Sequence, residues 1–171
     1  MRTHAAATEG GFSIVEMLFA LAIAGVLLAM AVPALQGMAL RKQVQESLAL
    51  AKLPESGVQV VWALAAKMPA NNAEASVPVP EKIIGNTVSR VDVKEGAVTL
   101  TFGNNAGTAL HGKKLTLRPA VVADTPLVPI AWLCHTAPVP NGMEVRGENQ
   151  TDVPAEWLPV ECRGPSAAGA K

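Results

Sequence analysis

The 171-residue sequence is poor in charged, histidine, cysteine and aromatic residues, and these shortages exclude several classes of function. Charged residues make up 16% of the chain and cancel to a formal net charge of zero, which argues against a dominant nucleic-acid-binding surface. The three histidines are scattered, no Gly-rich phosphate loop follows an expected strand, and no Ser/His/Asp arrangement is visible. We therefore expect no catalytic residues, no metal and no cofactor.

Charge is missing most completely between Met17 and Leu40, where 24 successive residues include no Asp, Glu, Lys or Arg. As a helix this run is long enough to cross a hydrocarbon layer of about 30 Å, which takes about 20 residues. Glu16 lies directly before it. Because an unpaired carboxylate in lipid costs several kcal/mol, Glu16 needs a partner. This need indicates a helix that leaves lipid and packs against copies of itself.

A short polar segment, residues 1–11, precedes the apolar run. A secretory signal peptide places its small-residue cleavage site after the apolar core. Here the plausible processing point, Gly10-Gly11, lies before that core, so cleavage would leave the apolar stretch on the mature chain.

These N-terminal residues resemble the type IV prepilin signal. In that signal a Gly ends the leader, a Phe begins the mature chain and a Glu is its fifth residue, as in Gly11, Phe12 and Glu16 here. Gly25 and Pro33 also match small and helix-breaking positions of the family. Pseudopilins and competence pilins share the signal, and a plain single-pass anchor with an accidental Glu is the alternative outside the family.

The helical pattern continues beyond the apolar run. Apolar residues recur at helical spacing in two groups: Val44, Leu48 and Ala51, then Val58 and Trp62. Pro54 interrupts this stretch, and we expect it to kink the helix without ending it. Pro33 and Gly37 form a second weak point, at which we expect local unwinding once the lipid-facing surface of the helix becomes a packed protein surface.

Short strands are expected after the helix, at residues 86–93, 97–102, 115–117 and 130–134. The second alternates most clearly, with apolar residues at 98, 100 and 102 and threonines between them. Lys94-Glu95-Gly96 supplies a turn in which Gly96 can take a positive φ. The expected fold class is α+β: a long N-terminal helix whose C-terminal half packs on a four-stranded antiparallel sheet.

Two cysteines, Cys134 and Cys162, predict one disulfide in a domain carried outside the cytoplasm, with two buried free thiols as the alternative. The loop between them is rich in Pro and Gly, and Trp157 and Leu158 are its expected apolar anchors. The resulting plan divides the chain into a leader (1–11), an apolar transmembrane and filament-core helix (12–40), an amphipathic helix (41–68), a region of linker, antiparallel sheet and disulfide loop (69–163), and a flexible tail (164–171).

The C-terminal half extends the resemblance to the globular domain of major type IVa pilins. The segments that carry it include Asn71–Ala75, Thr101–Asn105, Lys114–Leu117, Pro129–Cys134 and Trp157–Pro159 with Cys162. The chain departs from the family's pattern in having no tyrosine, and in Leu35 and Met38 where aromatic residues are frequent. An abundant subunit and a low-copy paralogue both remain compatible with the sequence.

The resemblance implies a structural role. Prepilin peptidase would cut between Gly11 and Phe12 and methylate the amine of Phe12. The helix would then hold the subunit in the inner membrane of a Gram-negative bacterium, with its globular domain in the periplasm. Pilus assembly machinery would polymerise subunits into a helical surface filament for adhesion or twitching motility, with Glu16 neutralising the N-terminal amine of a neighbouring subunit.

The sequence is also compatible with two other classes of protein: a DNA-uptake (competence) pilin and a pseudopilin of a type II secretion system. The residues that bear on DNA are Lys113, Lys114 and Arg118, whose expected role is a solvated strand face. Asn149-Gln150-Thr151 fits a glycosylation sequon, for which an ordinary turn is the alternative. Cys134 beside His135 suggests a metal pair, but adjacent strand residues point to opposite faces, so no metal is expected there.

Overall fold

The structure is a computed structural model that describes residues 11–164, without the side chains of residues 31–35. The chain forms two compact units, Met1–Gln36 and Gly37–Lys171. Apart from Gly11 and Gly164, the expected leader and tail lie outside the described residues.

One helix, α1 (Ile14–Ala65), extends over 52 residues and begins in the first unit. It is continuous through positions 33, 37 and 54, so Pro54 does not end it, as expected. The expected kink at Pro54 and unwinding at Pro33 and Gly37 stay predictions. The helix ends at Ala65, slightly before the expected residue 68, and Ala66 then takes a left-handed φ of 51°. In the part of the chain described here, no helix is both long enough and apolar enough to cross a membrane.

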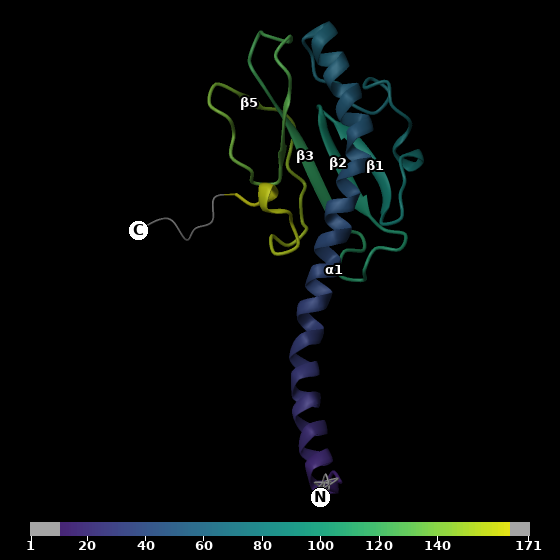
Figure 1. Cartoon of the computed structure of the whole chain (residues 1–171). Coiled ribbons are helices and arrows are strands. Elements are labelled where there is room, and N and C mark those ends of the chain that lie inside the picture. The colour runs from purple at the N-terminus through teal and green to yellow at the C-terminus, as the bar shows by residue number, and fades with distance from the viewer. Residues whose placement is uncertain (1–10, 165–171) are drawn as a thin grey trace, which may run out of the picture. The chain divides into compact units, whose positions relative to one another are not determined.

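The second unit contains an antiparallel sheet in the order β1-β2-β3-β4. Figure 1 shows β1, β2 and β3 side by side in this sheet. Its strands are β1 (Val88–Lys94), β2 (Ala97–Phe102), β3 (Lys114–Val121) and β4 (Ala131–Cys134). The expected four strands are all present, and β2 has the expected bounds. Two short 3₁₀ helices, η1 (Pro80–Lys82) and η2 (Val160–Cys162), complete the elements together with β5 (Glu144–Val145), which pairs with β3.

Strand β3 is longer than expected, because it continues through Pro119 to Val121. The carbonyl of Pro119 accepts a hydrogen bond from the Arg146 N–H at 2.9 Å, on the edge of β3 that β5 occupies. Strand β2 pairs with β3 only as far as Leu117, so no β2 residue needs a donor from Pro119. Proline is tolerated in a strand where its missing N–H has no ladder partner.

The turn between β1 and β2 follows the sequence prediction. Glu95 and Gly96 both have positive φ, at 51° and 80°, the backbone of a two-residue hairpin turn. Gly96 also packs tightly: a Cβ there would lie 2.6 Å from the sulfur of Met68. Glycine is therefore required at this position for conformation and for space.

The C-terminal half of α1 packs on one face of the sheet, which confirms the α+β prediction (Figure 1). The predicted helix positions Val44, Ala51, Val58 and Trp62 are buried, and Leu48 is partly buried against them. From the sheet the core receives Val91, Val98, Leu100, Phe102, Leu115 and Leu117. The second unit thus encloses a core of its own.

Candidate functional site

The expected processing residues lie just before α1. Gly11, Phe12 and Ser13 are not helical, and the Phe12 side chain is 76% exposed. A Cβ placed on Gly11 meets no atom of the described residues within 4 Å. The described part of the fold therefore does not require glycine at position 11.

Glu16 lies in the first turn of α1, where the N-H groups at the helix start favour a negative charge. It is exposed, and it makes no ion pair with any described residue. From Gly11 to Leu40 it is the only ionisable side chain in the sequence. A lone carboxylate thus heads an apolar helix without a partner among the described residues of its own subunit.

The described residues around and after Glu16 are exposed as far as Met30. They include large apolar side chains on every side of the helix: Phe12, Ile14, Val15, Met17, Leu18, Phe19, Leu21, Ile23, Val26, Leu27, Leu28 and Met30. A helix that is apolar all round is normally buried in protein or lipid. This stretch therefore requires an apolar environment that the subunit alone does not provide.

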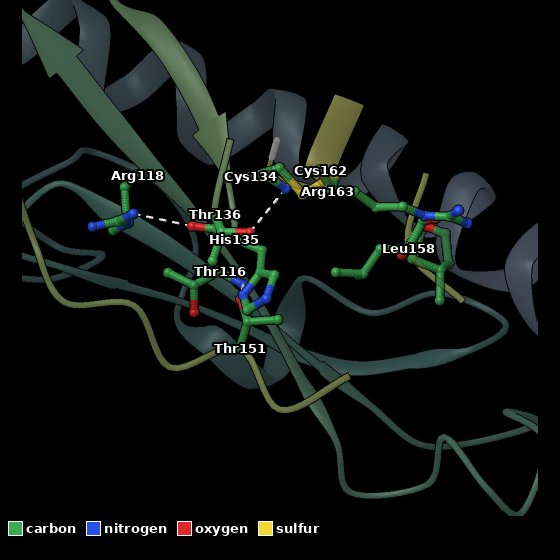
Figure 2. Close-up of a disulfide and its surroundings, with 12 residues drawn as sticks. Thr116, Arg118, Cys134, His135, Thr136, Thr151, Leu158, Cys162 and Arg163 are labelled. Carbon is green, nitrogen blue, oxygen red and sulfur yellow. Dashed lines mark hydrogen bonds between the residues drawn. A yellow bond between two sulfur atoms is a disulfide. The ribbon is translucent and has the colours of Figure 1, made fainter. Parts of the chain in front are cut away.

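The predicted disulfide joins Cys134, at the end of β4, to Cys162 in η2 (Figure 2). Their Cα atoms are 4.6 Å apart, and no free cysteine remains. Of the two expected loop anchors, Leu158 is fully buried in the core and Trp157 packs against it. The bridge and the two anchors fix a loop that has little regular structure.

Two arginines also hold this loop, a role that the sequence did not reveal. Arg41 on α1 donates to the carbonyl oxygen of Glu156 through Nε at 3.3 Å and Nη2 at 2.7 Å. Arg163 donates to the same oxygen through Nη2 at 3.2 Å, and through Nε to the carbonyl of Leu158 at 2.9 Å. The loop is thus tied directly to the helix within the second unit.

His135 lies one residue beyond β4, with a left-handed φ of 50°, and not within a strand as the sequence analysis expects. Its carbonyl accepts from Arg118 Nη2 at 3.0 Å, and its Nδ1 lies 3.3 Å from Asn149 Nδ2. Burial, and secondarily the charge of Arg118, lower the pKa of His135. The sulfur of Cys134 is committed to the disulfide, and no described group of His, Cys, Asp and Glu residues could hold a metal ion.

Residues of the sequon match, and Arg118 of the basic cluster, make hydrogen bonds within the second unit. Thr151 N–H donates to Asn149 Oδ1 at 3.1 Å, and Thr151 Oγ1 accepts from Thr116 N–H at 2.9 Å, so side-chain hydrogen bonds hold this segment beside β3. Asn149 is half-buried, as is Arg118, which is committed to the His135 carbonyl. The cluster therefore does not form a row of free cations.

Asn72 is a second structural residue whose role the sequence did not reveal. It is buried, and its amide donates to the carbonyls of Pro78 and Val91 at 2.9 and 3.0 Å. Its Oδ1 accepts from Val93 N–H at 2.7 Å. Asn72 thus attaches the segment that follows α1 to strand β1. In the sequence, the only indication of this role was its position in a segment that resembles pilins.

Similarity to known proteins extends over most of the chain. The sequence profile of the family Pilin (bacterial filament) matches residues 40–163. A fimbrial protein of Neisseria meningitidis serogroup A is 31% identical over 170 residues, which cover 94% of this chain and 98% of that protein. A type IV major pilin protein PilE of Neisseria gonorrhoeae is 36% identical over 161 residues, covering 91% and 94% of the two chains. The chain therefore belongs to the pilin family of bacterial filament proteins.

Proposed function

We propose that the mature chain is a structural subunit of a type IV pilus, which polymerises through its N-terminal helix into a surface filament. Glu16 carries this proposal most directly. It is a lone carboxylate at the head of a helix whose described side chains are exposed and apolar as far as Met30. Such a surface gains most from packing against equivalent helices, because each copy then supplies apolar contacts to the next.

The partner proposed for Glu16 is the N-terminal amine of a neighbouring subunit. Cleavage between Gly11 and Phe12 would create that amine, and no Lys or Arg follows Glu16 until Arg41. Breaking a buried pair by removing one partner costs about 3–5 kcal/mol, because the other charge remains buried and unpaired. The pair would therefore set the register in which a new subunit docks.

Before assembly, the subunit is proposed to reside in the inner membrane with its globular domain in the periplasm. The support is the uncharged run from Met17 to Leu40 in the sequence and the disulfide, a bond that persists in oxidising compartments such as the periplasm. Prepilin peptidase is the proposed processing partner, and pilus assembly machinery the proposed agent of extraction. Movement from lipid into a helix bundle exchanges one apolar environment for another.

The test substitutes Glu16 and counts surface filaments. Glu16→Ala should leave cleavage and membrane insertion intact, since removal of a charge favours the bilayer. It should abolish or cripple filament growth, because an uncompensated amine would remain in the core. Electron microscopy of cells counts the filaments, and mass spectrometry of the membrane fraction for peptides beginning at methylated Phe12 measures cleavage.

Glu46→Ala provides a matched control. Glu46 is an exposed carboxylate on the same helix, 3.7 Å from Lys42 Nζ, and surface pairs of this kind contribute little. It should assemble normally. Wild-type filament numbers from Glu16→Ala would contradict the pairing mechanism, and equal loss in both variants would show that the assay reports carboxylates in general.

A further inference from the structure

The face of the sheet opposite α1 contains a polar groove of about 500 Å³. Strand pairing places Arg90, Thr101 and Lys114 in one row across β1, β2 and β3, and Asp92, Thr99 and Thr116 in the next. The hydroxyls of Thr99 and Thr116 hydrogen-bond at 3.1 Å. Threonine side chains thus form the base of the groove, and charged side chains line its edges.

The positively charged side chains of the groove differ in whether a carboxylate already pairs with them. The Arg90 guanidinium is hydrogen-bonded to both oxygens of Asp92 and also pairs with Glu81 at 3.1 Å. Lys94 and Lys114 are exposed, and neither has a carboxylate within ion-pair distance among the described residues. Two free ammonium groups therefore border a groove in a chain whose net charge is zero.

The two lysines lie at different ends of the groove. Lys94 pairs with Ala97 and Lys114 with Thr101, which separates them by about 13 Å along the strands and about 10 Å across them. Gln150 lies beside Lys114, with its Oε1 3.5 Å from Nζ. A ligand that engages both lysines must therefore be extended and carry more than one negative group.

We propose that this groove binds an extended acidic saccharide, whose carboxylate or sulfate groups pair with Lys94 and Lys114 while its hydroxyls contact Thr99, Thr101, Asp92 and Gln150. Hydroxyl, carboxylate and amide groups supply both donors and acceptors, as the hydroxyls of a sugar require. The volume lies within the range of small-ligand sites.

Other classes of macromolecule fit the groove less well. None of the described aromatic side chains lines it, so it lacks the stacking platform of single-stranded nucleic acid sites. Two free cations are few beside the roughly 6–10 phosphate contacts of typical duplex binders. Protein interfaces usually have an apolar core enriched in aromatic residues, whereas seven of the eight residues that line this groove are polar or charged. An acidic saccharide is the ligand whose chemistry these residues match.

The experiment measures binding of a heparin-derived hexasaccharide to the purified full-length chain in detergent, by isothermal titration calorimetry. Lys94→Gln combined with Lys114→Gln should weaken binding by about tenfold or more, through the loss of two charge-assisted contacts. Lys67→Gln combined with Lys82→Gln removes the same charge from exposed lysines that do not line the groove, and should bind as the unmodified chain does. Maltohexaose, which is neutral, should not bind.

Three results would overturn the proposal: equal loss of binding in both double variants, tighter binding of a 20-base-pair DNA duplex than of the hexasaccharide, or equal affinity for inorganic sulfate. The first would indicate a general charge effect, the second a nucleic-acid site and the third a simple anion site. Because the groove lies within one subunit, this assay is independent of filament formation. Failure of the saccharide proposal and failure of the pilus proposal are thus distinguishable.

Discussion

The two units of the chain use apolar side chains in opposite ways. In the second unit, Phe102 is 1% exposed and belongs to a core closed by helix, sheet and disulfide loop. In the first, Leu21 is 65% exposed, like its described neighbours. The second unit is therefore stabilised by its own contacts, whereas the first presents apolar surface for other molecules. Substitutions should separate the two roles, since one class changes the free energy of unfolding and the other changes processing and assembly.

The largest effect is expected from Gly11→Val. The described residues leave open space at this position, so the substitution should leave the second unit folded. If prepilin peptidase requires glycine at the end of the leader, the variant should yield no mature chain and no filaments. Mass spectrometry of the cellular protein reads the N-terminus directly.

Gly37→Ala provides the comparison, because its added Cβ also meets no described atom within 4 Å and alanine is favourable in a helix. This variant should be processed normally. Normal mature protein from Gly11→Val would contradict the assignment of the cleavage site.

Phe102→Ala and Leu21→Ala test whether apolar side chains stabilise the second unit but serve assembly in the first. Phe102→Ala should lower the free energy of unfolding by about 3–5 kcal/mol, the usual cost of truncating a buried aromatic side chain. Leu21→Ala should leave it unchanged and instead reduce filament yield. All three tryptophans lie in the second unit, so urea unfolding of the full chain in detergent can be followed by tryptophan fluorescence. A large loss of stability from Leu21→Ala would show that the first unit is not independent.

Cys134→Ser tests the covalent closure of the second unit. The bridge spans 28 residues, and loop-closure entropy assigns to a loop of this length about 3.5 kcal/mol at 25 °C. Urea unfolding should show a loss of that order, and the reduced wild-type chain should match the variant. Modification of both cysteines in the native, unreduced protein by a thiol reagent would contradict the bridge.

The features that were predictable from the sequence are local or strongly periodic. The helix positions Val58 and Trp62 and the strand β2 (Ala97–Phe102) follow directly from apolar spacing. The disulfide could be predicted because only two cysteines were available to pair. Gly11 and Glu16 were found by motif and charge, although their proposed partners are other molecules.

The features that were missed depend on contacts distant in sequence. Arg41 and Glu156 are 115 residues apart, and no spacing rule relates them. Strand β5 (Glu144–Val145) is too short for alternation to be visible. The groove requires Lys94 and Lys114 to be brought to one face by strand pairing, whereas in the sequence Lys114 was grouped with Arg118. These features become visible only once the register of the sheet is known.

Arg41→Gln tests the attachment of the loop to α1. It removes both hydrogen bonds to the Glu156 carbonyl, and should cost about 1.5 kcal/mol, near the lower end for bonds from a charged donor because the site is exposed. Lys42→Gln, at the neighbouring exposed position, should change little. Hydrogen exchange should show faster exchange of the Trp157 and Leu158 amides in Arg41→Gln only. Unchanged exchange there would show that the disulfide and anchors hold the loop without Arg41.

The smallest effect is expected from His135. Burial, with a smaller contribution from Arg118, lowers its pKa below the ordinary value of 6.5. The unfolded chain therefore binds a proton at higher pH than the folded chain does. The stability contributed by neutral His135 should be complete above about pH 6.5 and should be lost as pH falls through the lower folded pKa. Unfolding of the wild type measured across that range should show this decline, and His135→Gln, which cannot titrate, should make the profile flatter. A parallel profile in the variant would show that other groups cause the pH dependence.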